Sequence, residues 1–167
     1  IENLTSTDPT ALLDAPKTGR MLPDTLSKED IEKLLDAIDR STPEGERNRA
    51  MLEVLYSCGL RVSELVNLKI SDVFLDEEYI RVIGKGNKER RVPFGTPAKK
   101  AIEDSLGDRP SREATTPLFV NFRGTRLTAR SVARILTKHL VRMAAVRSIS
   151  PHGLRHSFAT HLLAAGA

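Results

Sequence analysis

The sequence predicts a mainly α-helical domain that carries one small antiparallel β-sheet (an α+β fold). Most of the chain repeats apolar residues at helical spacing, whereas one short region alternates apolar and polar residues around a glycine-rich turn. The 167 residues, 40% of them hydrophobic, are enough for one core. We expect this domain over residues 25–167. Residues 1–24 lack periodicity and contain three prolines, which is typical of a linker after a preceding module.

Three helices are expected in the first part of the domain. Ser27, with Asp30 three residues later, precedes apolar residues at helical spacing and marks a helix start. A second helix is expected from Pro43 to Cys58, with Gly59 as its stop. A short helical turn over residues 62–68 follows.

The middle of the chain predicts a β-hairpin. Tyr79 to Ile83 is rich in β-forming residues, and Arg90 to Phe94 alternates in the same way. The segment GKGNKE between them holds two glycines and an asparagine, which favour a tight turn. A helix over residues 97–106 and a polar loop over 107–116 complete this part.

Two helices are expected in the last third. One runs from Thr128 to about Val146 and is amphipathic, with apolar residues on one side and a basic residue every fourth position on the other: Arg130, Arg134, Lys138 and Arg142. The other is capped by Ser150, has Pro151 at its first position, and is expected to stop at Gly166.

Charge is distributed unevenly along the chain. The net charge is +4, yet the first 113 residues hold 18 basic and 22 acidic residues. After Glu113 there are eight basic residues and no acidic one. This asymmetry predicts that the last third faces a polyanion such as nucleic acid. The plain alternative is a solvated basic face.

Several functional classes are disfavoured. No apolar run approaches the roughly 18 residues of a membrane span, and no signal peptide is evident. The single cysteine, Cys58, lies in an apolar stretch, which favours a buried thiol and a reducing, cytoplasmic location. One cysteine and four histidines without close spacing argue against a zinc site. We expect no metal and no cofactor.

Four polar residues form the main functional candidate: Arg61 in CGLRVSEL, Lys85 in IGKGNKERRVP, and His152 and Arg155 in SPHGLRHSFATHL. Two arginines suit a phosphodiester, because each can donate two hydrogen bonds to it and stays charged. Histidine and lysine suit the proton transfers that strand cleavage needs. Each residue also has a plain alternative role, such as a surface arginine paired with Glu64 or an idle lysine in a turn.

The order and context of these motifs resemble the catalytic domain of tyrosine site-specific recombinases, most closely the Xer type. The resemblance covers nearly everything from Leu26 onward. It implies that Arg61 and Arg155 clamp the scissile phosphate, that His152 assists as donor and acid or base, and that Lys85 protonates the leaving 5′ hydroxyl. Glu64 would support Arg61.

The resemblance also implies double-stranded DNA as a partner and, for the whole protein, other recombinase protomers, the same or a paralogue, in a synaptic tetramer. The segment LTARS resembles the start of a helix that enters the major groove. Candidate DNA contacts are therefore Thr128, Arg130, Ser131 and Arg134, together with Lys88 at the hairpin tip.

One part of the family pattern is missing. The nucleophilic tyrosine of these enzymes follows the HxLRH segment, and neither Tyr56 nor Tyr79 has that context. We therefore expect a fragment of a longer enzyme that cannot itself cleave DNA through a 3′-phosphotyrosine. The alternatives are a non-catalytic DNA-binding module or regulator and, more distantly, a type IB topoisomerase. The target site, and a role in chromosome partition or in mobile-element integration, stay open.

Overall fold

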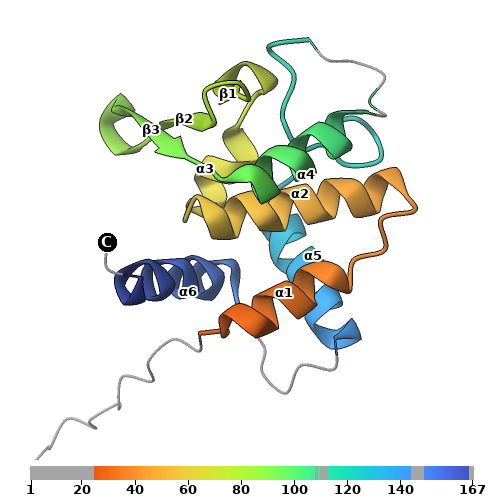
Figure 1. Ribbon diagram of the computed structural model, residues 1–167. Coiled ribbons are helices and arrows are strands. Elements are labelled where there is room, and N and C mark those ends of the chain that lie inside the picture. Colours follow the sequence, from red (N-terminus) through yellow and green to blue (C-terminus); the bar gives the residue numbers. More distant parts are fainter. Residues whose placement is uncertain (1–24, 108, 110–112, 144–148, 166–167) are drawn as a thin grey trace, which may run out of the picture.

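The computed structural model describes residues 25–107, 109, 113–143 and 149–165. Residues 1–24 and the expected stop at Gly166 lie outside this part. The described residues confirm a mainly helical fold with a small antiparallel sheet (Figure 1). The elements are α1 (Lys28–Asp36), α2 (Pro43–Ser57), α3 (Val62–Asn67), β1 (Val73–Phe74), β2 (Tyr79–Ile83), β3 (Glu89–Pro93), α4 (Thr96–Gly107), α5 (Ala129–Arg142) and α6 (Pro151–Ala164).

The expected helix boundaries are close to the observed ones, with one clear difference. The Ser27 side chain accepts a hydrogen bond from the Asp30 N–H, and that of Ser150 accepts one from the Gly153 N–H, so both predicted caps are confirmed. Helix α5 ends at Arg142 rather than near Val146, and Met143 is its C-terminal cap.

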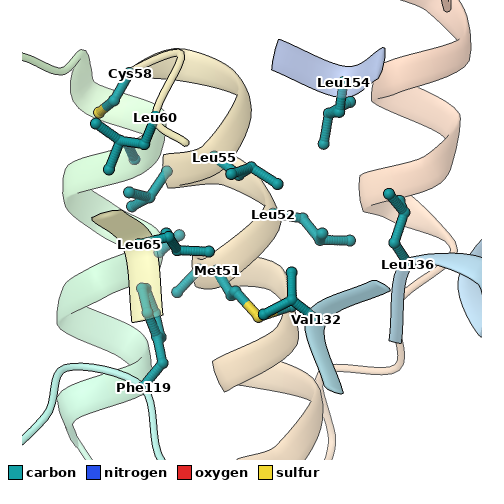
Figure 2. Close-up of a cluster of buried hydrophobic side chains, with 14 of the residues drawn as sticks. Met51, Leu52, Leu55, Cys58, Leu60, Leu65, Phe119, Val132, Leu136 and Leu154 are labelled. Atoms are coloured by element: carbon teal, nitrogen blue, oxygen red, sulfur yellow. The ribbon is translucent and has the colours of Figure 1, made fainter. Parts of the chain in front are cut away.

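Helix α2 lies at the centre of the domain and packs against α1, α3, α4 and α6 (Figure 1). Met51, Leu52 and Leu55 of α2 are fully buried. Figure 2 shows these side chains facing Val132 and Leu136 of α5 and Leu154 of α6. Segments far apart in the sequence therefore share one core around α2.

The sheet consists of three antiparallel strands in the order β1-β2-β3. Val82 pairs with Arg90 and Ile83 with Glu89, so the hairpin closes through the Gly84 N–H, which donates to the Lys88 carbonyl at 2.8 Å. Ile80 and Val82 point into the core. The strand β1 was not expected from the sequence. It has only two residues, too few for a recognisable alternation, and it is defined by its pairing with β2.

Helix α6 is fixed to the start and the centre of the domain by three contacts. The Leu26 N–H donates to Ser157 Oγ at 3.0 Å, and Ser157 is fully buried. Tyr56 Oη and His161 Nδ1 lie 2.9 Å apart. Gly59 has φ +55°, and a Cβ there would lie 2.3 Å from Cδ1 of Phe158. The ring of Phe158 thus occupies the space that a side chain at position 59 would need.

No helix of the described residues is both long and apolar enough to span a membrane.

We predict that Gly59→Ala destabilises the domain by about 2 to 4 kcal/mol, because it combines left-handed backbone strain with overpacking against Phe158. Gly124 is the matched control. It has φ +76° and no atom within 4 Å of an added Cβ, so Gly124→Ala should cost only about 1 to 2 kcal/mol. Urea unfolding of both variants measures the difference. Equal losses of unfolding free energy in the two variants would mean that the Phe158 ring moves aside without an energetic cost.

Candidate active site

Three of the four predicted catalytic residues line one pocket. Arg61 lies at the start of α3, directly after the turn that ends α2, and His152 and Arg155 lie in the first two turns of α6. The pocket has a volume of about 370 Å³, and its lining also includes Leu60, Val62, Ser63 and Pro151. The packing of α6 against α2 therefore brings residues about 90 positions apart to the same cavity.

The arginines of this pocket have unused hydrogen-bond donors. Arg155 Nη1 is buried and has no partner among the described residues. The Arg61 side chain is 60% exposed, and within the described ranges only its Nη1 binds a carboxylate, Glu64 Oε1 at 3.1 Å. A buried donor without a partner is costly, and an anion that reaches Arg155 Nη1 would offset that cost. His152 is exposed in the first turn of α6, where free backbone N–H groups also favour an anion.

A second pocket joins Arg61 to the hairpin. Its volume is about 340 Å³, and it is lined by Arg61, Ser63, Glu64, Asn67, Ile83 and Gly84. Lys85 follows Gly84 and begins the 3-10 turn Lys85–Asn87. The Lys85 side chain lies outside the described part of the structure, so its position relative to Arg61 stays a prediction.

Glu64 is the electrostatic centre of this region. Its side chain is only 5% exposed, and its two oxygens accept four hydrogen bonds. One comes from the Arg61 N–H at 2.8 Å, one from Arg61 Nη1, and two from Arg90, each at 2.9 Å. Burial alone would raise the pKa of Glu64, but the hydrogen bonds from Arg90 and Arg61 and the Arg90 charge lower it to about 2. Glu64 is therefore ionised at neutral pH and accepts two hydrogen bonds from Arg61.

Arg90 is a site residue that the sequence analysis missed. It lies on β3, and its hydrogen bonds to Glu64 raise its own pKa. The sequence did contain a signal, because strand alternation places Arg90 on the same side as Val92 and the buried Phe94. An arginine on the inner side of a strand needs a buried partner.

The expected DNA-contact residues lie on an exposed basic face. Arg130, Arg134, Lys138 and Arg142 are all exposed on α5, opposite the buried Val132 and Leu136. Thr128 caps α5 by accepting from the Ser131 N–H, and the hydroxyls of these two residues lie 2.9 Å apart. Lys88 is exposed at the end of the hairpin turn.

The remaining candidates are structural. Tyr56 binds His161, and Tyr79 stacks on Phe74 with ring centroids 4.4 Å apart, so both tyrosines have packing partners. Cys58 is buried, and burial raises the pKa of its thiol to about 11. Among the described residues, no three His, Cys, Asp or Glu side chains gather where they could hold a metal ion.

The sequence profile of the phage integrase family matches residues 24–167. The chain belongs to this family. Similar proteins are named tyrosine recombinases of the Xer type, the group that the motifs resembled. The tyrosine recombinase XerC of Pelobacter propionicus is 48% identical over 97% of the chain, and the tyrosine recombinase XerD of Oceanobacillus iheyensis is 45% identical over 99%. The resemblance to Xer-type recombinases is confirmed.

Solved structures of this family agree with the fold. XerA recombinase has a TM-score of 0.78 and 32% identity, and the match covers 87% of this chain and 53% of XerA. XerH recombinase, solved on its difH substrate before cleavage, has a TM-score of 0.72 and 28% identity, with 87% of this chain and 44% of that one covered. The chain spans 54% and 57% of the lengths of the XerC and XerD relatives.

We predict that Glu64→Gln lowers the free energy of unfolding at pH 7 by about 1 to 3 kcal/mol, because it weakens hydrogen bonds to two charged arginines. The folded-state pKa of Glu64, about 2, is below its ordinary value of 4.5, so the unfolded chain takes up the proton first as pH falls. The difference between the parent and the variant should therefore be full above pH 4.5 and shrink between pH 4.5 and pH 2. Urea unfolding across this range tests it. A constant difference would contradict the paired carboxylate.

Proposed function

We propose that this chain is the phosphate-binding catalytic domain of a DNA strand transferase that cleaves and rejoins duplex DNA in site-specific recombination. The observation that carries the proposal is the pocket where Arg61 and Arg155 meet, together with a buried Arg155 Nη1 that has no hydrogen-bond partner in the described part of the chain. Family membership and the Xer relatives support the same reaction.

In the proposed mechanism, Arg61 and Arg155 bind the two non-bridging oxygens of the scissile phosphate. Negative charge grows on these oxygens in the transition state, and donors placed there in advance stabilise it. Glu64 holds Arg61 through its backbone N–H and one side-chain nitrogen, Nη1, which leaves the other donors of that guanidinium for the phosphate. The N-terminus of α6 adds a favourable field for the anion.

Two residues then manage protons. His152 lies in the same pocket as the arginines, within the region where the nucleophile and the phosphate would meet, and acts as hydrogen-bond donor and acid or base. Lys85, at the tip of the hairpin beside the second pocket, protonates the leaving 5′ oxygen. When the strand is cleaved, the phosphodiester is exchanged for a phosphotyrosine ester and the 5′ hydroxyl leaves, and rejoining reverses the exchange. The ester retains the energy of the broken bond, so the proposed reaction needs no cofactor.

The nucleophile belongs to the same proposal. Tyr56 and Tyr79 are held in packing contacts and line neither pocket. We therefore place residues 25–167 as the catalytic domain of a longer recombinase that supplies the tyrosine, with residues 1–24 as the connection to its DNA-clamping module. The whole recombinase works with further protomers in a synaptic tetramer.

Duplex DNA would lie along α5 and the hairpin. The exposed basic face of α5, with Arg130 and Arg134 near its start, enters the major groove, and Thr128, Ser131 and Lys88 contact the DNA beside it. The charge asymmetry of the sequence supports this orientation, because the acid-free last third contains both α5 and α6.

We predict that Arg61→Ala and Arg155→Ala, made in the full-length recombinase, each slow cleavage by about 100- to 1000-fold and leave site affinity nearly unchanged. Arg40→Ala is the control. Arg40 is paired with Glu46 and Asp104 near the other end of α2, roughly 20 Å from the pocket, and should cleave normally. A single-turnover assay on a suicide substrate measures the rates. An arginine variant that cleaves at the parental rate would remove that residue from the site.

We predict that Arg130→Ala relaxes sequence preference, whereas Lys138→Ala weakens binding about equally on all sequences. Arg130 lies in the first turn of α5 and can reach base edges, where one arginine–guanine pair discriminates by roughly 1 to 3 kcal/mol. Lys138 lies two turns further along the same face. The measurement is affinity for a cognate and a scrambled site at matched salt. If Arg130→Ala lowers both affinities by the same factor, Arg130 contacts only the backbone.

A further inference from the structure

The Glu64 carboxylate links two parts of the candidate site that are separate in the sequence. Arg61 comes from the turn before α3, and Arg90 comes from β3 of the hairpin. Both bind the same 5%-exposed carboxylate, so a single charged group joins the turn to the sheet. The turn of this hairpin begins at Lys85, so the contact joins the segment that carries Arg61 to the hairpin that carries Lys85.

Arg90 is suited to holding the carboxylate rather than the DNA. Its Nη1 and Nη2 each bind one oxygen of Glu64 at 2.9 Å, which is the two-point geometry that fixes a guanidinium most firmly. Its fork is thereby occupied, and Arg90 lines neither of the two pockets that contain Arg61. Arg61, in contrast, donates to Glu64 from one side-chain nitrogen, Nη1.

The hairpin is held close to this guanidinium. Arg90 pairs with Val82, and its guanidinium reaches Gly84 just after β2, where a Cβ would lie 3.4 Å from Arg90 Nη1, in ordinary van der Waals contact. Lys85 is the next residue. A shift of the Arg90 side chain would therefore move the base of the turn that carries Lys85. Misplacing a catalytic group by about 1 Å can slow a reaction by about 100-fold.

We propose that Arg90 is a positioning residue of this site: by clamping Glu64 it fixes the β2–β3 hairpin, and with it Lys85, relative to Arg61. The proposal rests on the function proposed above, since it assigns Lys85 the proton for the leaving 5′ oxygen. It predicts that Arg90 matters most when that proton is needed.

The same sheet offers a matched control. Arg81 on β2 binds Asp72 through Nε and Nη2, and Asp72 also accepts from the Lys69 N–H, as Glu64 does from that of Arg61. The two arginines are similarly exposed, 36% for Arg81 and 39% for Arg90. Asp72 contacts neither Arg61 nor Arg90 by any hydrogen bond or ion pair among the described residues, so losing Arg81 removes an equivalent pair without touching Glu64.

The experiment compares two DNA substrates in the full-length recombinase, an ordinary phosphodiester and one with a 5′-bridging sulfur, which leaves without a proton. Arg90→Gln should cleave the ordinary substrate about 10- to 100-fold more slowly than the parent, with unchanged site affinity, and should recover most of that loss on the sulfur substrate. Lys85→Ala should show the same pattern. Arg81→Gln should cleave both substrates as the parent does.

Arg90→Lys keeps the charge but not the fork, so it should retain most of the defect and serves if Arg90→Gln folds poorly. The proposal is overturned if the Arg90 variants cleave at the parental rate, if Arg81→Gln loses as much, or if sulfur restores nothing. Arg155→Ala separates the two levels. If Arg155→Ala cleaves DNA at the parental rate, the proposed function is wrong. If Arg155→Ala is inactive on both substrates while Arg90→Gln is fully active, only the role of Arg90 is wrong.

Discussion

The burial of α2 is the constraint on which the rest of the domain depends. Met51, Leu52 and Leu55 are fully buried, and burying each such side chain stabilises the fold by roughly 2 kcal/mol. Helices α1, α3, α4 and α6 are all placed by their contact with this one helix. The pocket with Arg61 and Arg155 forms where the chain leaves α2 and α6 passes beside it, so the geometry of the candidate site follows from core packing.

A single anion organises the cations of the site. Positive groups placed near one another repel, and the charge of Glu64 offsets that repulsion between Arg61 and Arg90. Its low pKa keeps it charged across the physiological range. Glu64 accepts from both terminal nitrogens of Arg90 but from only one side-chain nitrogen of Arg61, so Arg61 keeps more of its guanidinium for a further partner.

Local features of the fold could be predicted from sequence, whereas contacts between distant segments could not. The caps at Ser27 and Ser150 and the strand Tyr79–Ile83 follow from residue types within a few positions, and all three are observed. The motif resemblance indicated which side chains would share a pocket, and Arg61, His152 and Arg155 do share one. Arg90 and β1 escaped notice because their partners, Glu64 and β2, are chosen by tertiary packing rather than by local pattern.

The buried state of Cys58 has a practical side. It is the chain's only cysteine, and its thiol, 5% exposed with a pKa near 11, is almost entirely protonated at neutral pH. Thiolate is the reactive form, so we expect native, buried Cys58 to react slowly with alkylating reagents and mild oxidants. A cysteine introduced on the exposed face of α5 or at the hairpin tip would therefore react alone. The domain is a natural background for attaching one fluorophore or spin label at a chosen position without first removing a thiol.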